Sequence, residues 1–265
     1  MKDYLPEHWQ RILSHNKLGD FASLWDLDAG WFEDLNKRRG GWSGVSHCEL
    51  DRPDGSIVGV FLKRQENHIT RTLTHPMGMP TFTREMQNIL RFKAADIPAL
   101  EPVYYAERRI DGDLRAILVT EELAGYESLE DWVTRCARQG WPTRQLRARL
   151  MRAVAVVMSK MNQHHLQHNC FYPKHIFIRF DGDDISVRII DLEKTKWRLF
   201  KSYAMFRDLY TLNRHSQRWS RTDRLRFFLI YLGLKRLTPR ARALWHSIAQ
   251  RTIKKGRLRN IGRAQ

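Results

Sequence analysis

The residues with the clearest chemical potential lie between positions 164 and 191. A polar segment over 164–175 contains the side chains that could bind a metal ion or move a proton: His164, His165, His168, Cys170 and His175. Two apolar runs follow, over 176–180 and 185–190, with an Asp/Gly turn between them, and the second run leads into Asp191. Two short apolar runs joined by such a turn are typical of a β-hairpin. The sequence therefore predicts a hairpin framed by a histidine-rich loop and a carboxylate.

Protein kinases place a catalytic loop and a metal-binding aspartate around a hairpin of this kind. In that order, His168 and His175 occupy the outer positions of the loop, and Asp191 follows the second strand. The position of the catalytic aspartate holds Cys170. The pattern predicts a kinase-like site without its usual general base. Cys170 is then either a reactive thiol or a small buried residue, and the buried role is the commoner one.

A second interpretation of the same loop is a zinc site. His164 and His168 are four residues apart and could share one face of a helix, and His175 could complete the cluster. The kinase order already accounts for His168 and His175, so we expect no dedicated zinc site. We expect His165 to be solvated.

The segments that would position this site begin with a glycine-rich turn. Its amides could cover the phosphates of a nucleotide, and its candidate residues are Gly40, Gly41, Ser43 and Gly44. A strand over 57–63 ends in Lys63, and an amphipathic helix over 82–92 carries Glu85 in its first turns. Kinases hold a phosphate-binding lysine with such a Lys–Glu pair. The alternatives are a plain hairpin at the glycines and a solvated charge at Lys63.

The connection between Lys63 and this helix, residues 64–81, is predicted to be a long irregular loop. Loops of this length are often functional or mobile. Its cationic residues could contact a phosphorylated substrate, but a solvated basic face is the favoured interpretation; they are Arg64, His68, Arg71 and His75.

Two further strands, over 103–107 and 115–123, complete the N-terminal part. They end as the hinge of a kinase does, which makes Glu121 and Leu123 candidate nucleotide contacts. From residue 125 the apolar spacing becomes helical, and the main helix is expected over 143–163.

This order of elements predicts an α+β protein with a two-lobed, protein-kinase-like fold. The N-terminal lobe, residues 1–123, would contain an antiparallel sheet and one key helix. The C-terminal lobe, residues 124–265, would be mainly helical. Trp197 and Phe200 are predicted to lie in the core rather than to form a binding platform.

Together these motifs resemble the lipopolysaccharide kinase (Kdo/WaaP) family, and within it the InaA-like subgroup. The resemblance covers most of the chain, from Arg39 to Arg226. It is strongest in the loop, where His168-Asn-Cys-Phe-Tyr-Pro-Lys-His175 is similar to His-Arg-Asp-Phe-Tyr-x-x-His. It also includes Lys63-Arg-Gln, Phe82-Thr-Arg-Glu, Asp191-Leu-Glu and Arg207-Asp-Leu.

The resemblance implies a role for each matching residue. Lys63 would bind the phosphates of ATP, and Asp191 would hold Mg²⁺ with His175 as the second ligand. His168 would be structural and would brace the loop. Asp208 would be buried and would hydrogen-bond the backbone of the loop.

The activity implied by the resemblance is transfer of a phosphoryl group from ATP to a sugar of the lipopolysaccharide inner core, or to a related anionic glycolipid, at the cytoplasmic face of the inner membrane. Cys170 is the departure, because losing a general base typically lowers a rate by ~10²–10⁴-fold. Phosphoryl transfer depends mainly on positioning and charge stabilisation, and those groups are retained. We expect weak or atypical kinase activity; the alternative is a nucleotide-binding pseudokinase with a regulatory or scaffold role.

The composition limits the partners. Of 265 residues, 46 are Lys or Arg and 29 are Asp or Glu, which gives a net charge of +17. This favours a polyanionic partner such as a phospholipid surface, a nucleic acid or a phosphorylated glycolipid. No RNP, KH or zinc-finger pattern is present and the aromatic residues lie within apolar stripes, so no nucleic acid is expected.

The cysteines and the apolar runs predict the compartment. Cys48, Cys136 and Cys170 are widely spaced and form no Cys-x-x-Cys pair, as expected in a reducing compartment. The sequence shows neither a signal-peptide pattern nor an apolar run long enough to cross a bilayer. We expect a soluble cytoplasmic protein that can attach peripherally to the inner membrane.

Overall fold

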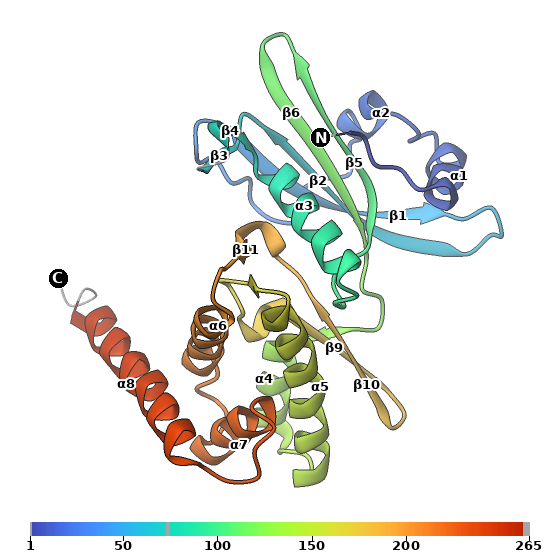
Figure 1. Ribbon diagram of the computed structural model, residues 1–265. Coiled ribbons are helices and arrows are strands. Elements are labelled where there is room, and N and C mark those ends of the chain that lie inside the picture. Colours follow the sequence, from blue (N-terminus) through green and yellow to red (C-terminus); the bar gives the residue numbers. More distant parts are fainter. Residues whose placement is uncertain (1, 73–74, 262–265) are drawn as a thin grey trace. The chain divides into compact units, whose positions relative to one another are not determined.

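The structure, a computed structural model, describes residues 2–72 and 75–261 (Figure 1). The chain forms two compact units. The first contains Met1–Lys93 and Ala99–Ala124, and the second contains Ala94–Pro98 and Gly125–Gln265. The short segment Ala94–Pro98 therefore packs with the second unit, and the carbonyl of Pro98 accepts a hydrogen bond from the amide of Ile189 at 3.2 Å.

The first unit is built on a four-stranded antiparallel sheet in the order β1-β2-β6-β5. Its strands are β1 (Trp42–Asp51), β2 (Ile57–Glu66), β5 (Pro102–Ile110) and β6 (Asp113–Glu121). Apolar residues alternate along β2, and Val58, Val60 and Leu62 are buried in one core with the helices α1 (Glu7–His15) and α2 (Phe21–Trp25). Because side chains alternate across a strand, Lys63 points to the opposite face. There it meets α3 (Thr81–Ala94).

The prediction of an irregular loop over residues 64–81 is wrong, because most of this segment forms strands. Strand β2 continues to Glu66, and a hairpin of β3 (Ile69–Thr72) and β4 (His75–Pro80) follows, with a register shift between Thr70 and Thr72. Pro, Gly and Met interrupt the two-residue alternation of β4, so the sequence does not look like a strand.

The prediction that the basic side chains of this segment form a solvated face is also wrong for two of them, Arg64 and His68. Arg64 is buried, its Nη1 donates to the carbonyls of Trp25 and Leu27 at 2.7 Å each, and its guanidinium lies 4.7 Å from the centre of the Trp31 ring. His68 is buried as well, 3.1 Å from the hydroxyl of Thr81. Both side chains are therefore structural.

The second unit begins with β7 (Glu127–Ser128) and two helices, α4 (Leu129–Gln139) and α5 (Arg144–Gln163). Each helix starts at a side-chain cap: the hydroxyl of Ser128 accepts from the amide of Asp131 at 3.0 Å, and the hydroxyl of Thr143 accepts from the amide of Leu146 at 3.3 Å. The helix predicted over 143–163 is confirmed to within one residue. It leads directly into the histidine-rich segment.

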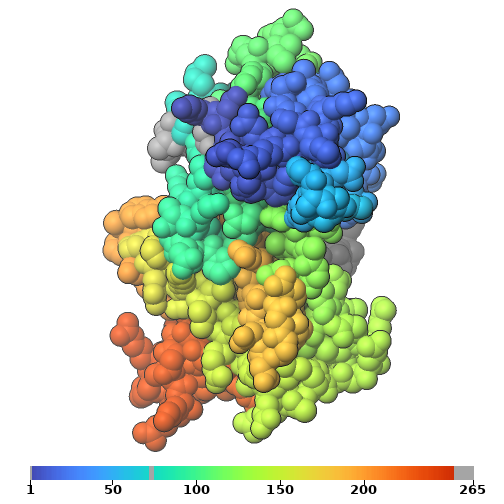
Figure 2. Space-filling view, turned by 90° about the vertical axis from the view of Figure 1, so that its right-hand side faces the viewer, coloured from blue at the N-terminus to red at the C-terminus, as the bar shows by residue number. Residues whose placement is uncertain are grey.

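The hairpin predicted after that segment is confirmed. Strand β9 (Ile176–Asp181) pairs with β10 (Asp184–Ile189) in antiparallel register, and β7 adds a third strand beside β9. The tip of the hairpin lies on the surface that faces the viewer in Figure 2. The short elements around the hairpin are β8 (Leu166–Gln167), the 3₁₀ turns η1 (Pro173–His175) and η2 (Leu192–Lys194), and β11 (Lys196–Trp197).

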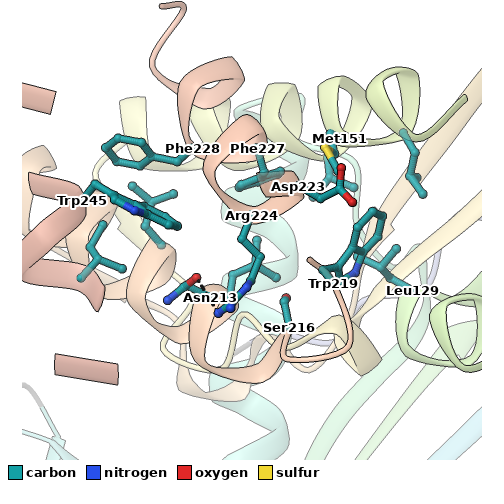
Figure 3. A pocket seen from close by; sticks show the side chains of 15 residues that line it. Leu129, Met151, Asn213, Ser216, Trp219, Asp223, Arg224, Phe227, Phe228 and Trp245 are labelled. Carbon is teal, nitrogen blue, oxygen red and sulfur yellow. Dashed lines mark hydrogen bonds between the residues drawn. The ribbon is translucent and has the colours of Figure 1, made fainter. Parts of the chain in front are cut away.

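The chain ends in three helices, α6 (Lys201–His215), α7 (Arg221–Tyr231) and α8 (Pro239–Ile261). Together with α4 and α5 they surround an apolar cavity with about 570 Å³ of empty space, part of it open to solvent (Figure 3). Trp219, Phe228 and Trp245 line it, and the side chain of Arg224 reaches among them to the amide oxygen of Asn213 at 3.3 Å. No helix of the described residues is long and apolar enough to cross a membrane.

The core prediction for Trp197 and Phe200 is wrong. These side chains are 57% and 67% exposed. For Trp197 the reason is local: β11 is only two residues long and pairs with the equally short β8, so the element provides no second layer to cover its side chains. Phe200 lies beyond β11, immediately before α6.

Candidate functional site

The predicted Lys–Glu pair is formed within the first unit. The Nζ of Lys63 donates to Oε1 of Glu85 at 2.7 Å, and the two side chains are 15% and 5% exposed. Lys63 lies inside β2 rather than at its end, with Val45 opposite it on β1 and Leu118 on β6. The alternative of a solvated strand-end charge is therefore wrong. Burying two charges is costly unless they are paired, so this geometry fixes the ammonium in one place.

Gln65 is a positioning residue that the sequence interpretation missed. It is fully buried two residues beyond Lys63. Its Oε1 accepts from the hydroxyl of Thr81 at 2.8 Å and from the amide of Phe82 at 2.9 Å, and its Nε2 donates to the carbonyl of His68 at 2.7 Å. The start of α3 is thus tied to β2, and this sets where Glu85 stands.

The glycine-rich turn is a hairpin turn in which Gly41 and Gly44 are tightly packed. Residues 31–39 run beside β1, and Asn36 and Ser43 exchange backbone hydrogen bonds of 2.9 and 3.1 Å around Gly40 and Gly41. A Cβ on Gly41 would lie 2.0 Å from the carbonyl oxygen of Glu66, and one on Gly44 would lie 2.4 Å from the Trp31 ring. Packing alone therefore requires glycine at both positions.

The face of the sheet that carries Lys63 also carries a cluster of aromatic side chains and one carboxylate. The Phe61 ring lies 5.4 Å from the Phe32 ring and 5.1 Å from the imidazole of His47, measured between centroids. His47 Nε2 lies 2.9 Å from Oε2 of Glu122. That carboxylate lies over Gly59, where a Cβ would be 1.7 Å away.

The predicted hinge residues, Glu121 and Leu123, do not join the group formed by Phe61, His47 and Glu122. Glu121 is the last residue of β6, opposite Val60, and its carboxylate lies 4.0 Å from Arg52. Leu123 follows the strand. Nothing in the sequence marks Glu122 as a site residue. The face of the sheet toward which its side chain points depends on how β6 is paired with β2, and the sequence alone does not give that register.

His168, in the histidine-rich loop of the second unit, is fully buried. Its Nδ1 accepts from the amide of Cys170 at 3.2 Å, and its Nε2 lies 3.0 Å from the carbonyl of Ile190. A carbonyl oxygen only accepts, so Nε2 carries the proton. Burial lowers the pKa of His168 to about 3, which keeps the imidazole neutral. His168 thus holds the loop against the end of β10.

Asp208 of α6 holds the same loop from the other side, as the resemblance implied. It is fully buried, and its Oδ2 accepts from the amide of His168 at 3.0 Å and from Nδ2 of Asn162 at 3.1 Å. Its Oδ1 accepts from the amide of Asn169 at 3.2 Å. Burial raises the pKa of Asp208 to about 7, although the three donors and Arg207 act in the opposite direction.

Cys170 is buried, at 6% exposure. Burial and the nearby carboxylate of Asp191 raise the pKa of its thiol. The thiol therefore stays protonated at neutral pH and cannot take a proton from an acceptor hydroxyl as a carboxylate would. The small buried role, not the reactive thiol, fits this position.

His175 and Asp191 are brought together at the end of the loop. The Nδ1 of His175 donates to the carbonyl of Cys170 at 2.9 Å and lies 3.4 Å from Oδ2 of Asp191. Burial lowers the pKa of His175 to about 4, so its Nε2 presents a lone pair at neutral pH. A histidine that donates one ring nitrogen to a carbonyl and offers the other is the usual arrangement of a metal ligand. Asp191 adopts a left-handed backbone, with φ of 58° and ψ of 57°.

The zinc interpretation finds no support in the part of the chain that the structure describes, where no three His, Cys, Asp or Glu side chains gather in a metal-binding group. His164 is exposed at the end of α5. His165 is half-buried rather than solvated: its Nδ1 lies 2.8 Å from the carbonyl of Arg198, and its ring stacks on Trp197.

Comparison with known proteins relates this chain to a known family. The model of the lipopolysaccharide kinase (Kdo/WaaP) family matches residues 22–231. Protein InaA of Escherichia coli is 30% identical over 207 residues, which cover 78% of this chain and 93% of InaA. The lipopolysaccharide core heptose(I) kinase WaaP of Pseudomonas aeruginosa is 28% identical over 165 residues, 56% of this chain and 58% of that protein.

The fold has a close counterpart among solved structures. A structure described as WaaP in complex with acyl carrier protein has a TM-score of 0.69 to this chain, at 23% identity, over 96% of this chain and 99% of that one. This confirms the predicted α+β, kinase-like fold. The family model covers well over half of the chain. This protein therefore belongs to the lipopolysaccharide kinase (Kdo/WaaP) family.

Proposed function

We propose that this chain is an ATP-dependent phosphotransferase whose acceptor is a sugar hydroxyl of the lipopolysaccharide core or of a related anionic glycolipid, and that it turns over slowly. The observation that carries this proposal is the buried Lys63–Glu85 pair at 2.7 Å. A buried ion pair adds little net stability, since desolvation offsets the attraction. Its use is to fix an ammonium, and a fixed ammonium suits the phosphates of a nucleotide.

The sheet face that carries Lys63 suits the rest of the nucleotide. Phe61, with Phe32 and His47 beside it, offers an aromatic surface on which an adenine ring could stack. In this proposal the main chain of Glu121 and Leu123 contacts the base, and the turn at Gly40 covers the phosphates. Gly41, Ser43 and Gly44 support the turn through their packing.

The donor set of the second unit fits a nucleotide-bound Mg²⁺. Asp191 would hold the ion through a carboxylate oxygen and His175 through Nε2. Two protein ligands are few, but Mg²⁺ usually completes its coordination with phosphate oxygens and water. When bound, the ion supplies positive charge that neutralises the phosphates. His168 and Asp208 act through the loop backbone and keep His175 and Asp191 in place.

A thermal-shift assay with Mg-ATP tests the nucleotide site. We expect the wild type to melt at a higher temperature with Mg-ATP, and we expect Lys63→Ala and Asp191→Ala each to lose that shift. Lys235→Ala, an exposed lysine in the second unit, is the matched control. An unchanged shift in both variants, or no shift in the wild type, would remove the assignment.

The second candidate function is a nucleotide-binding pseudokinase with a regulatory or scaffold role at the envelope. The buried, protonated thiol of Cys170 favours it, because residues 164–175 contain no Asp or Glu that could act as the base in its place. Transfer of ³²P from ATP to lipopolysaccharide core acceptors separates the two functions. A thermal shift without transfer supports the pseudokinase.

A further inference from the structure

An exposed apolar patch lies next to the histidine-rich loop of the second unit. Ten large apolar side chains are exposed in the described residues, and four of them lie within residues 197–203. The patch consists of Trp197, Leu199, Phe200 and Tyr203, at 57%, 65%, 67% and 48% exposure. Soluble proteins rarely expose such a cluster unless it contacts a partner.

The same segment is strongly basic. The patch is interleaved with Lys194, Lys196, Arg198 and Lys201, and residues 194–203 contain no Asp or Glu. Large apolar side chains beside lysines with long aliphatic stems are the composition of segments that lie at a membrane interface. We infer that the 194–203 segment docks this protein on an anionic phospholipid surface, with the patch inserted among the lipids.

The patch is held in a formed structure rather than on a loose loop. Trp197 pairs with Leu166 between β11 and β8, and its ring stacks on His165 at 5.5 Å between centroids. Nε of Arg198 donates to the side-chain oxygen of Gln167 at 2.7 Å, and its guanidinium lies 5.2 Å from the centre of the Tyr203 ring. Trp197 and Tyr203 are therefore already ordered, and their insertion into a membrane would lose little further side-chain entropy.

These contacts argue against two other partners. Single-stranded nucleic acid binds by stacking bases on open aromatic faces, but His165 covers one face of Trp197 and Arg198 covers one face of Tyr203, so two of the three aromatic rings of the patch offer at most one face to a base. Protein interfaces are depleted in lysine, whereas three of the four cations here are lysines. A bilayer requires neither open ring faces nor an absence of lysine.

The position of the patch relates it to the proposed function. Gln167, which pairs with Lys196, directly precedes His168. Lys194 is the last residue of η2, the short turn that begins immediately after Asp191. Docking would bring the loop to the height of a glycolipid head group. This last step rests on the proposed function, whereas membrane binding itself does not.

The test is co-sedimentation of the full chain with sucrose-loaded vesicles, without ATP. We expect binding to vesicles that contain phosphatidylglycerol, weaker binding at high salt, and little binding to phosphatidylcholine alone. Leu199→Ala with Phe200→Ala should weaken binding at least about tenfold, because each inserted side chain is lost from the apolar phase. Lys196→Gln with Lys201→Gln should also weaken it.

Two matched controls locate the effect. Ile57→Ala with Val156→Ala removes two other side chains that are each 60% exposed, and Lys235→Gln with Arg236→Gln removes the same charge elsewhere. Both should bind as the wild type does. Equal binding by the patch variants and these controls would overturn the inference. So would a patch-dependent dimer in light scattering, or patch-dependent retention on RNA but not on vesicles. Vesicle binding without an ATP-induced thermal shift would contradict only the proposed function.

Discussion

The imidazole Nδ1 of His175 donates to the carbonyl oxygen of Cys170 at 2.9 Å. The loop is therefore held by the main chain of residue 170, which also accepts from the amide of Tyr172 at 2.7 Å. The side chain takes no part in these two contacts. A different side chain at position 170 can thus change the chemistry of the loop while these contacts are kept.

Cys170→Asp tests whether a missing base limits the rate. A carboxylate at this position could accept the proton of a sugar hydroxyl, so we expect transfer from ATP to appear or to increase, with ~10²-fold as the lower end of the usual effect of a general base. The measurement is ³²P transfer to core acceptors at saturating Mg-ATP. Cys170→Ala is the control and should give no gain.

The contrary results are specific. Robust transfer by the wild type that Cys170→Asp abolishes would show that the thiol is not a defect. No gain in a Cys170→Asp variant that still shows the Mg-ATP thermal shift would point to the pseudokinase.

Lys63 and Glu85 should be strongly coupled in stability. Lys63→Met leaves the buried Glu85 carboxylate without its partner, which we expect to cost about 3–5 kcal/mol of unfolding free energy. The double variant with Glu85→Leu should recover most of that loss, because it removes both charges together. Urea unfolding of the two single variants and the double variant measures the coupling.

The same variants separate stability from function. The recovered double variant should still lack the Mg-ATP thermal shift, because the ammonium is gone. Additive losses in the three unfolding curves would show that the pair is not coupled, and a normal shift in the double variant would show that Lys63 does not bind the nucleotide.

The Lys63–Glu85 pair shows what sequence order can predict. Its two members are spaced as a strand residue and a helix residue of the kinase pattern, and the family restricts where each can lie. The hairpin before Asp191 was equally predictable, because two short apolar runs, over 176–180 and 185–190, flank a clear Asp/Gly turn. Local pattern was sufficient for these elements.

Gln65 shows why other parts were missed. The sequence prediction ended the strand at Lys63 and placed Gln65 in an irregular loop, and only the longer β2 and the β3–β4 hairpin bring His68 and Thr81 around it. The prediction for Trp197 and Phe200 was wrong for the opposite reason: an aromatic side chain looks like a core residue in the sequence, but more than half of each of these two side chains is exposed in the structure. Both errors concern which neighbours arrive from distant sequence, and local composition does not contain that information.

Asp208 gives the stability of the protein a predictable pH dependence. Burial raises its pKa from 3.8 to about 7. Below the lower value both the folded and the unfolded state hold the proton. As the pH rises from there to about 7, the unfolded state releases its proton first, so Asp208 contributes progressively less stability, and above that range its contribution is constant.

The measurement compares the wild type with Asp208→Asn by urea unfolding across this pH range. The free energy of unfolding of the wild type, relative to that of the variant, should fall as the pH rises from about 4 to about 7. The amide side chain of the variant does not titrate, so contributions of other groups cancel in the difference. A difference that stays flat would show that the N–H donors of His168 and Asn169 keep the carboxylate ionised throughout.

Arg224 should be a residue that weakens the fold. Its guanidinium enters the apolar cavity of the second unit, burial and the nearby Arg221 lower its pKa, and its buried Nε has no hydrogen-bond partner among the described residues. Its Nη1 donates to the amide oxygen of Asn213 at 3.3 Å, which is a long hydrogen bond. A partly desolvated cation with so little compensation costs stability. Arg224→Met keeps the length of the side chain and removes the charge, so we expect the unfolding free energy to rise by about 1 kcal/mol and the melting temperature by about 2–4 °C.

The matched control for this change is Arg242→Met, which removes an exposed arginine of α8 in the same unit. It should leave the melting temperature nearly unchanged, because surface substitutions have small effects. Destabilisation by Arg224→Met, with Arg242→Met neutral, would mean that the guanidinium has a compensating interaction in the cavity. A buried anion that copurifies with the wild type and is absent from the variant, detected by native mass spectrometry, would identify that interaction.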